Sequence, residues 1–445
     1  MLIYNAQIIN EGRIYMGYLA TKGNKIALVA EGKPSETVLR QYPDAMDAKG
    51  AWLIPGGIDA HVHFREPGLT HKADIEHESK AALAGGITSF MEMPNTVPQT
   101  TTIEAWEEKY DLAQQSSYAN YAFYIGATND NANQWKRIDK QRLCGIKLFL
   151  GSSTGNMLVS EEKALQQIFA EAETLVATHC EDEQIIRANM ERFRSKGLPI
   201  PIAYHPLIRS REACVRSTEQ AMNWAEKYGT QLHVLHISTT EELSLLSEGA
   251  HRDKRITAET CPHYLFFSDK DYETMGARIK CNPAIKTSND REYLSRAVHT
   301  TKIDTIGSDH APHLLSDKEG DCTKAVSGFP SIQHNIPLLF DLTEQGLFTK
   351  EDIVRTLSHA PADIYKVEQR GYLKEGYYAD FVLLQTCEPY EIQTNDLLYK
   401  CQWSPLVGKS LHHRVQMTVL NGVVAYTDGQ FAESSAAMPL HFARN

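Results

Sequence analysis

Eight short apolar runs alternate with longer amphipathic stretches through the middle of this 445-residue chain. Parallel strands need long crossover connections, which helices usually supply, so this alternation predicts a parallel sheet covered by helices. Eight such units close into a barrel, which commonly takes about 250 residues. The runs are WLIPGGIDAHVHF, GITSFMEMP, YANYAFYIGAT, GIKLFL, TLVATHC, QLHVLHIS, RITAETC and DTIGSDHAPH. We therefore expect an α/β protein whose residues 54–366 form a (β/α)8 TIM-type barrel.

The two ends of the chain share a sequence pattern that differs from the pattern of the middle. Short alternating runs punctuated by glycine, such as LIYNAQIIN and KIALVAE near the start and VQMTVLNGVVAY near the end, are typical of antiparallel strands with tight turns. Neither end shows a long helical period. Residues 1–53 and 367–445 are therefore expected to form one small β-sandwich domain built from both chain ends.

The composition is that of an ordinary globular protein, with 42% apolar and 23% charged residues. The net charge is −11, and acidic and basic residues are mixed along the chain, which argues against nucleic acid or anionic lipid as a partner. Without a signal-like start or a run of about 18 apolar residues, we expect no membrane span and a cytoplasmic location. The eight cysteines are scattered without a CxxC pair, which fits a reducing compartment.

Histidines and one aspartate stand at the ends of several runs, where the active site of a barrel lies. His61 and His63 are two residues apart, so on a strand both imidazoles lie on one face and can bind one metal ion. His179, His236 and Asp309 end the fifth, sixth and eighth runs. Imidazole and carboxylate suit zinc. We expect the first pair and Asp309 to hold one ion, and the other two histidines to hold a second.

Lys147 ends the fourth run, in the otherwise apolar stretch GIKLFL. A lysine pointing into the barrel mouth there is costly unless it is paired or modified. Two interpretations remain open. Either the ammonium is paired with an acid, or the amine adds carbon dioxide and the resulting carbamate bridges two metal ions.

Several other histidines are interpreted as structural. His71 and His77 fall in a helix-like acidic stretch, and His233 has the outward parity on the strand that ends at His236, so these three are excluded as ligands. A residue can also orient a metal ligand without touching the metal. The residues that could act in this way are His205, Glu259, His263 and His310.

The stretches GGIDAHVHFREPG and GSDHAPHLLSDK resemble the two signature segments of the dihydroorotase family, and the likeness extends over nearly the whole chain, to GYLKEGYYADFVLL. The resemblance implies two zinc ions per subunit and a carboxylated lysine, in a site made of His61, His63, Lys147, His179, His236 and Asp309. It implies that the substrate carboxylate is held by Arg65, Asn95 and His313. The ring contacts that it implies involve Asn282 and the backbone near Gly328 and Phe329.

The activity implied by the resemblance is the reversible hydrolysis of the cyclic amide of (S)-dihydroorotate to N-carbamoyl-L-aspartate, in de novo pyrimidine biosynthesis. Zinc lowers the pKa of bound water to about 7, so a hydroxide is available to attack the ring carbonyl. Asp309 would take the proton and return it to the leaving ring nitrogen. The planar guanidinium of Arg65, two residues beyond His63, matches a carboxylate.

Two alternatives remain. Another cyclic amidohydrolase, such as an allantoinase or a hydantoinase, would use the same metal site, but its substrate ring carries no carboxylate for Arg65 and His313. An inactive scaffold is the weaker alternative, because all six metal positions hold competent residues. The partner expected is the small-molecule substrate alone, and a homo-oligomer is compatible with the sequence.

Overall fold

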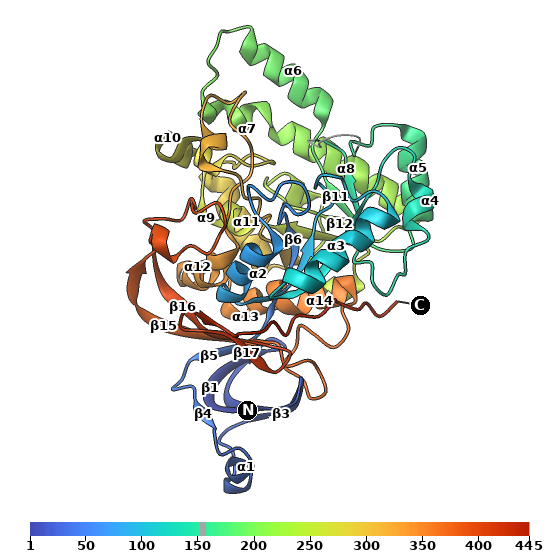
Figure 1. Cartoon of the computed structure of the whole chain (residues 1–445). Coiled ribbons are helices and arrows are strands. Elements are labelled where there is room, and N and C mark those ends of the chain that lie inside the picture. Colours follow the sequence, from blue (N-terminus) through green and yellow to red (C-terminus); the bar gives the residue numbers. More distant parts are fainter. Residues whose placement is uncertain (152–156, 445) are drawn as a thin grey trace.

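The computed structural model describes residues 1–151 and 157–444. The protein consists of two joined bodies (Figure 1). The upper body in this view is a barrel of parallel strands surrounded by helices, and the lower body is a β domain built from both ends of the chain. Both parts of the predicted fold class are confirmed. Among the described residues, no helix combines the length and the apolar character needed to cross a membrane.

The barrel strands follow the eight predicted runs in order. They are β6 (Gly57–Val62), β7 (Ile87–Glu92), β8 (Asn120–Phe123), β9 (Ile125–Gly126), β10 (Ile146–Phe149), β11 (Val176–His179), β12 (Leu232–Val234), β13 (Ile256–Thr260) and β14 (Thr305–Ile306). One run forms both β8 and β9, and so connects the sheet β6-β7-β8 to the sheet that runs from β9 to β14. The barrel closes where Val62 forms a parallel bridge with His310, whose carbonyl accepts from the amide of His63 at 2.8 Å.

Helices cover the outside of the barrel, whereas the short helix Glu36–Gln41 lies in the β domain (Figure 1). The longest, α8, begins after Ser210, whose side chain accepts from the amide of Ala213, and ends at Gly229 in the left-handed conformation, with φ 73°. The helices are α1 (Glu36–Gln41), α2 (Ile75–Ala84), α3 (Ile103–Ser116), α4 (Ala132–Trp135), α5 (Glu162–Glu171), α6 (Glu183–Arg194), α7 (His205–Ile208), α8 (Arg211–Tyr228), α9 (Pro262–Phe266), α10 (Tyr272–Met275), α11 (Ser288–His299), α12 (Asn335–Leu342), α13 (Lys350–Val354) and α14 (Ala360–Tyr365).

The β domain is a nine-stranded sheet in the order β18-β17-β16-β15-β5-β1-β2-β3, with β4 beside β1. Its strands are β1 (Leu2–Asn10), β2 (Arg13–Lys22), β3 (Lys25–Glu31), β4 (Met46–Asp47), β5 (Trp52–Pro55), β15 (Phe381–Glu391), β16 (Ser410–Leu420), β17 (Val423–Thr427) and β18 (Gln430–Phe431). Strand β5 joins the two chain ends, because it pairs with β1 on one side and with β15 on the other. Ile8, Leu53 and Phe381, from these three strands, are fully buried in the core of the domain.

The first predicted run supplies a strand to each body, since β5 belongs to the β domain and β6 to the barrel. Gly56 and Gly57 form the crossing point between them. A side chain at Gly56 would begin 2.1 Å from the hydroxyl of Thr88, and one at Gly57 would begin 2.6 Å from Ile87. Only glycine lets the chain pass so close to β7.

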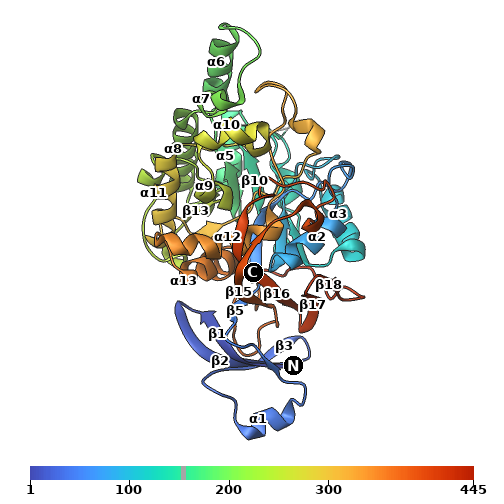
Figure 2. The ribbon, with the colours of Figure 1, turned by 90° about the vertical axis from the view of Figure 1, so that its left-hand side faces the viewer.

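Two segments of the carboxyl-terminal part return from the β domain to the barrel. Figure 2 shows β15, β16 and β17 close beneath the barrel, whereas β1, β3 and α1 extend away from it. Residues 392–409 connect β15 to β16 and contact the barrel loops, where Tyr399 accepts from the backbone amide of Gln333 at 2.9 Å. Residues 436–444 run along the barrel wall, and the amide of Leu440 donates to the carbonyl of Tyr121 at 2.8 Å.

Candidate metal centre and substrate cavity

A cavity of about 470 Å³ lies at the carboxyl ends of the barrel strands. All the predicted site residues except Phe329 line it, namely His61, His63, Arg65, Asn95, Lys147, His179, His236, Asn282, Asp309, His313 and Gly328. Phe329 is buried behind the wall, with its ring against that of His263 at 5.1 Å between centroids. Its carbonyl accepts from the amide of Ala311. The folded chain therefore gathers side chains from seven separate strand ends and loops around one space.

One group of ligand atoms comes from β6 and from the loop after β14. The imidazoles of His61 and His63 both place Nε2 close to Oδ1 of Asp309, at 3.2 Å and 3.0 Å. One ligand atom from each of the three residues lies within 4.8 Å of the others, a spacing that can hold a metal ion. Asp309 reaches this position from a left-handed backbone conformation, with φ 46°.

The far side of each ring determines which nitrogen faces Asp309 as an acceptor. Nδ1 of His61 lies 2.7 Å from a carboxylate oxygen of Glu259, and Nδ1 of His63 lies 2.7 Å from the amide oxygen of Asn95. Because these oxygens accept hydrogen bonds, each Nδ1 carries the proton. Burial lowers the pKa of His63 to about 4, so its ring is neutral at neutral pH. Its Nε2 lone pair then faces a carboxylate oxygen at 3.0 Å, which is repulsive unless a cation lies between them.

A second pair of imidazoles lies at the ends of β11 and β12. Nδ1 of His179 and Nε2 of His236 are 2.9 Å apart, and both side chains are buried. Nε2 of His179 lies 2.8 Å from Glu181, which also receives a hydrogen bond from the guanidinium of Arg209 at 2.9 Å. Since Glu181 accepts a hydrogen bond from the Nε2–H of His179, Nδ1 of this ring is unprotonated and presents a lone pair toward His236. Burial lowers the pKa of both histidines, which favours the neutral form that binds metal.

Lys147 projects from β10 into the same space and is completely buried. Among the described residues, its amine has neither a hydrogen-bond partner nor an ion pair. Among the described residues, no acid therefore lies within ion-pairing distance of this amine, although the charges of Asp309 and Glu259 act on it from farther away. Burial lowers the pKa of Lys147 to about 8, so a substantial fraction is the neutral, nucleophilic amine near neutral pH. An unpaired buried amine between two histidine clusters fits a group that is completed by carboxylation and metal.

The opposite wall of the cavity is cationic. Nε of Arg65 donates to the carbonyl of Pro312 at 3.0 Å, and a terminal nitrogen of the same guanidinium lies 3.0 Å from Nε2 of His313. The amine of Lys72 lies 3.0 Å from the other ring nitrogen of His313. Burial, followed by these two cations, holds the pKa of His313 well below its ordinary value. A neutral imidazole flanked by two cations can turn only one acceptor nitrogen toward them.

Gly328 closes the cavity next to His313. Its backbone has φ 113°, and a side chain there would begin 2.8 Å from the carbonyl of Ala311. The amide of Gly328 donates to the carbonyl of Lys280, and its own carbonyl accepts from the amine of Lys318 at 2.7 Å. The amide and the carbonyl of Gly328 therefore both help to hold this wall of the cavity in place.

His233 does not point outward as its parity suggested. Its ring is buried inside the barrel, with Nδ1 2.7 Å from the hydroxyl of Thr257 and Nε2 3.1 Å from that of Thr305. The alternation of β12 does not extend to His236, which lies beyond the end of the strand in a left-handed conformation, with φ 42°. Counting back in twos from His236 therefore gives the wrong face for His233.

Two of the residues considered for orienting a ligand lie close to the candidate metal ligands His61 and Asp309. Glu259 contacts His61 directly, and His310, next to Asp309, lies 2.8 Å from Glu78. The other two have different surroundings. Nε2 of His205 lies 2.8 Å from the carbonyl of Cys281, and the ring of His263 packs against those of Tyr264 and Phe329.

Sequence reasoning missed three residues of this region: Lys72, Glu181 and Arg209. Glu181 could have been found, because it stands two residues after His179 and shares its face of the strand. Lys72 and Arg209 lie in loops, where no periodicity indicates the direction of a side chain.

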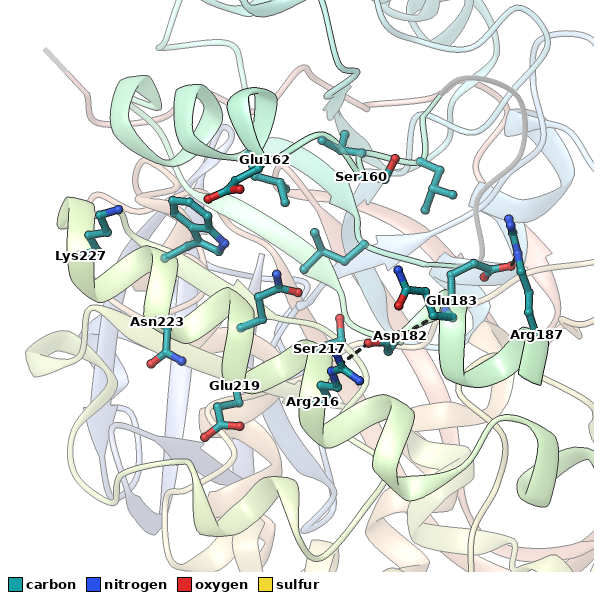
Figure 3. Close-up of a pocket in the computed structure, with 17 residues that line it drawn as sticks. Ser160, Glu162, Asp182, Glu183, Arg187, Arg216, Ser217, Glu219, Asn223 and Lys227 are labelled. Carbon is teal, nitrogen blue, oxygen red and sulfur yellow. Dashed lines mark hydrogen bonds and ion pairs between the residues drawn. The ribbon is translucent and has the colours of Figure 1, made fainter. Parts of the chain in front are cut away.

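A larger cavity of about 800 Å³ lies beside the first, among α5, α6 and α8 (Figure 3). Figure 3 shows Glu162 on one side of it and Arg216, Asn223 and Lys227 of α8 on the other. Leu158, Glu183 and Arg187 line both cavities. The candidate site therefore has a polar neighbouring space on the side of α6.

Comparison with known proteins agrees with this geometry. The sequence matches the amidohydrolase family over residues 52–425. A dihydroorotase from Methanosphaera stadtmanae is 30% identical over 402 residues, which are 89% of each chain. An allantoinase from Escherichia coli is 28% identical over 439 residues, which are 96% of this chain and 95% of the allantoinase.

The solved structure of an L-hydantoinase (dihydropyrimidinase) from Arthrobacter aurescens matches 99% of both chains with a TM-score of 0.92 at 24% identity. At that identity the likeness establishes the fold, whereas the choice of substrate has to be inferred from the cavity itself. The matched span includes every residue of the metal cluster at the carboxyl ends of the barrel strands. The chain therefore belongs to the amidohydrolase family, as a cyclic amidohydrolase.

Proposed function

We propose that this protein is a dihydroorotase that holds two zinc ions, hydrolyses the ring amide of dihydroorotate to carbamoyl aspartate and forms the ring in the reverse direction. Its place would be in pyrimidine biosynthesis in the cytoplasm. Three features of the cavity support the proposal, namely the two groups of metal-binding atoms, the unpaired lysine between them and the cationic wall around His313.

The residues that would hold the first ion are His61, His63 and Asp309, and those for the second are His179 and His236. Lys147 would bridge the two as a carbamate. The neutral amine attacks carbon dioxide, a nitrogen–carbon bond forms, and the proton lost from nitrogen passes to water. When bound, the ions supply Lewis acidity that activates a water molecule and polarises the amide carbonyl.

Asp309 is the group of this chain that would move the proton. Burial raises the pKa of its carboxyl, but the positive charge that His61 and His63 carry when they are protonated outweighs burial and holds that pKa well below its ordinary value. The group is therefore ionised and has an oxygen lone pair free to take a proton. As the water oxygen bonds to the ring carbonyl carbon, Asp309 takes the water proton, and it delivers that proton to the ring nitrogen as the carbon–nitrogen bond breaks.

The observation that carries the choice of substrate is the contact of His313 with two cations, Arg65 and Lys72, each at 3.0 Å. The neutral imidazole can accept from only one of them, so the other donor faces a ring N–H. A substrate carboxylate at this wall would accept the remaining N–H groups, and a planar guanidinium is suited to bind it. Dihydroorotate carries such a carboxylate, whereas the allantoin and hydantoin rings do not.

The test is ring opening by the zinc-loaded protein, followed through the ultraviolet absorbance of dihydroorotate, with allantoin, hydantoin and dihydrouracil as parallel substrates. We expect turnover of dihydroorotate and no comparable turnover of the rings without a carboxylate. Turnover of allantoin or hydantoin in preference would support the alternative cyclic amidohydrolases and contradict the proposed role of the cationic wall. A zinc-loaded protein that opens none of these rings would contradict the proposal in favour of an inactive scaffold.

A further inference from the structure

The connection between β15 and β16, residues 392–409, reaches the back of the substrate cavity. The side chain of Gln333 donates to the carbonyl of Asp396 at 2.7 Å and accepts from the amide of Leu398 at 2.9 Å. The amide of Lys400 donates to Glu78 at 3.1 Å, and Glu78 also contacts His310. A segment of the β domain is therefore tied to the loop that follows Asp309.

Trp403 is the member of this connection that contacts a residue lining the cavity, His313. Its indole N–H donates to the carbonyl of His313 at 2.7 Å, and the residue is buried, with 6% of its surface exposed. The next residue, Ser404, lies with its hydroxyl 3.4 Å from the carbonyl of Pro330 and accepts from the amide of Leu406 at 3.2 Å. The indole is therefore fixed by its own segment and points its single donor at one backbone atom.

The carbonyl oxygen of His313 belongs to a short segment, residues 312–313, that is held by hydrogen bonds from two side chains. Nε of Arg65 donates to the carbonyl of Pro312, and Trp403 donates to the next carbonyl, that of His313. The guanidinium of Arg65 and the ring of His313 are in turn 3.0 Å apart. The position of both cavity-lining groups therefore depends on two adjacent carbonyls, one of which is held from the β domain.

We propose that Trp403 is a positioning residue for the substrate carboxylate, which it serves by fixing His313. The inference rests on the proposed function, since it requires a substrate with a carboxylate. It gives the β domain a part in substrate binding. Among the described residues, Trp403 forms no hydrogen bond with His61, His63 or Asp309, so the effect falls on substrate affinity rather than on the metal.

The decisive variant is Trp403→Phe, which keeps an aromatic ring and removes the donor. We expect the KM for dihydroorotate to rise about five- to tenfold, because one buried hydrogen bond is lost and a carbonyl is left unsatisfied, while kcat and zinc content stay close to the wild-type values. The matched control is Trp106→Phe. Trp106 is also buried and also donates to a backbone carbonyl, that of Phe123 at 3.0 Å, but it lies on α3 outside the cavity.

A double-mutant cycle separates positioning from a general loss of stability. In a His313→Ala background, Trp403→Phe should raise KM less than twofold, because the ring that the tryptophan positions is already absent. If Trp403→Phe does not fold, Ser404→Ala provides the second test. It frees the amide of Leu406, loosens the same segment, and should raise KM with kcat maintained.

Three results would overturn the inference, and each has a different meaning. If the wild-type protein hydrolyses dihydroorotate but Trp403→Phe or Ser404→Ala keeps its KM, the role of Trp403 is refuted while the proposed function stands. If the wild-type protein opens only rings without a carboxylate, the proposed function fails and the inference fails with it. An equal rise in KM in the presence and absence of the His313 ring would also refute positioning through His313.

Discussion

Glu259 lies 2.7 Å from Nδ1 of His61, on the side of the ring opposite Asp309. A partner of this kind fixes the tautomer and orientation of a metal-binding histidine, and its loss typically costs about 10- to 100-fold in metal affinity. We therefore expect Glu259→Gln to bind zinc that much more weakly, which a competition titration against a chelator would measure.

The control for this prediction is Asp341→Asn. Asp341 lies 2.6 Å from Nδ1 of the buried His413 in β16 and so forms a similar carboxylate–histidine contact far from the cavity. Its loss should leave zinc affinity unchanged. Equal zinc affinity in Glu259→Gln and wild type would remove Glu259 from the metal centre.

Lys147 should carry an added carbon dioxide in the metal-loaded protein, visible as the corresponding mass increase in native mass spectrometry. Lys147→Ala should lose both metal and activity, and a short carboxylic acid supplied in solution should restore part of each. Lys286→Ala removes another buried lysine, one whose amine binds the carbonyl of Ala284, and should keep its metal. An alanine variant at position 147 with full activity would exclude a bridging role.

Arg65→Ala should raise the KM for dihydroorotate by roughly 10- to 100-fold, because a charge-assisted hydrogen bond contributes about 1.5–3 kcal/mol. Both zinc ions should remain, since Arg65 faces the substrate wall. Arg65→Lys should recover only part of the loss, because an ammonium lacks the planar fork of donors. Steady-state kinetics together with metal analysis would check this, and an unchanged KM in the alanine variant would contradict the carboxylate site.

The pH dependence of stability can be predicted for Asp290, at the start of α11. Its carboxylate binds Arg211 and accepts from the amide of Thr240 at 3.0 Å, and although burial opposes them, these contacts lower its pKa from 3.8 to about 2. The folded state therefore binds fewer protons than the unfolded state between these values, and stability falls as the pH falls through this range. The contribution at neutral pH is about 2 kcal/mol.

The test compares wild type with Asp290→Asn by chemical denaturation at a series of pH values. At pH 6 the variant should be less stable by about 2 kcal/mol, and the difference should shrink as the pH falls from about 4 to 2, where the wild-type carboxylate is protonated. A difference that stays constant over this range would show that protonation of Asp290 does not govern it.

The eight barrel strands could be predicted because each is a short apolar run bounded by polar or glycine-rich residues, and the pair His61 and His63 followed from strand periodicity. The direction of His233 could not be predicted, because that periodicity does not extend to His236, which lies beyond the end of the strand in a left-handed conformation. The contact of Trp403 with His313 joins residues 90 positions apart through an irregular connection. No local pattern encodes a contact of that kind.

The passage of one run through Gly56 and Gly57 also limits how the molecule can move. The strand that leaves the β domain at Pro55 reaches the first metal ligand, His61, without an intervening loop. Rotation of the β domain against the barrel would have to bend this strand where it is pressed against β7, and would displace both histidines. We therefore expect the two bodies to move as one unit, and we expect any opening of the cavity to involve the loops at the carboxyl ends of the barrel strands rather than a hinge between the bodies.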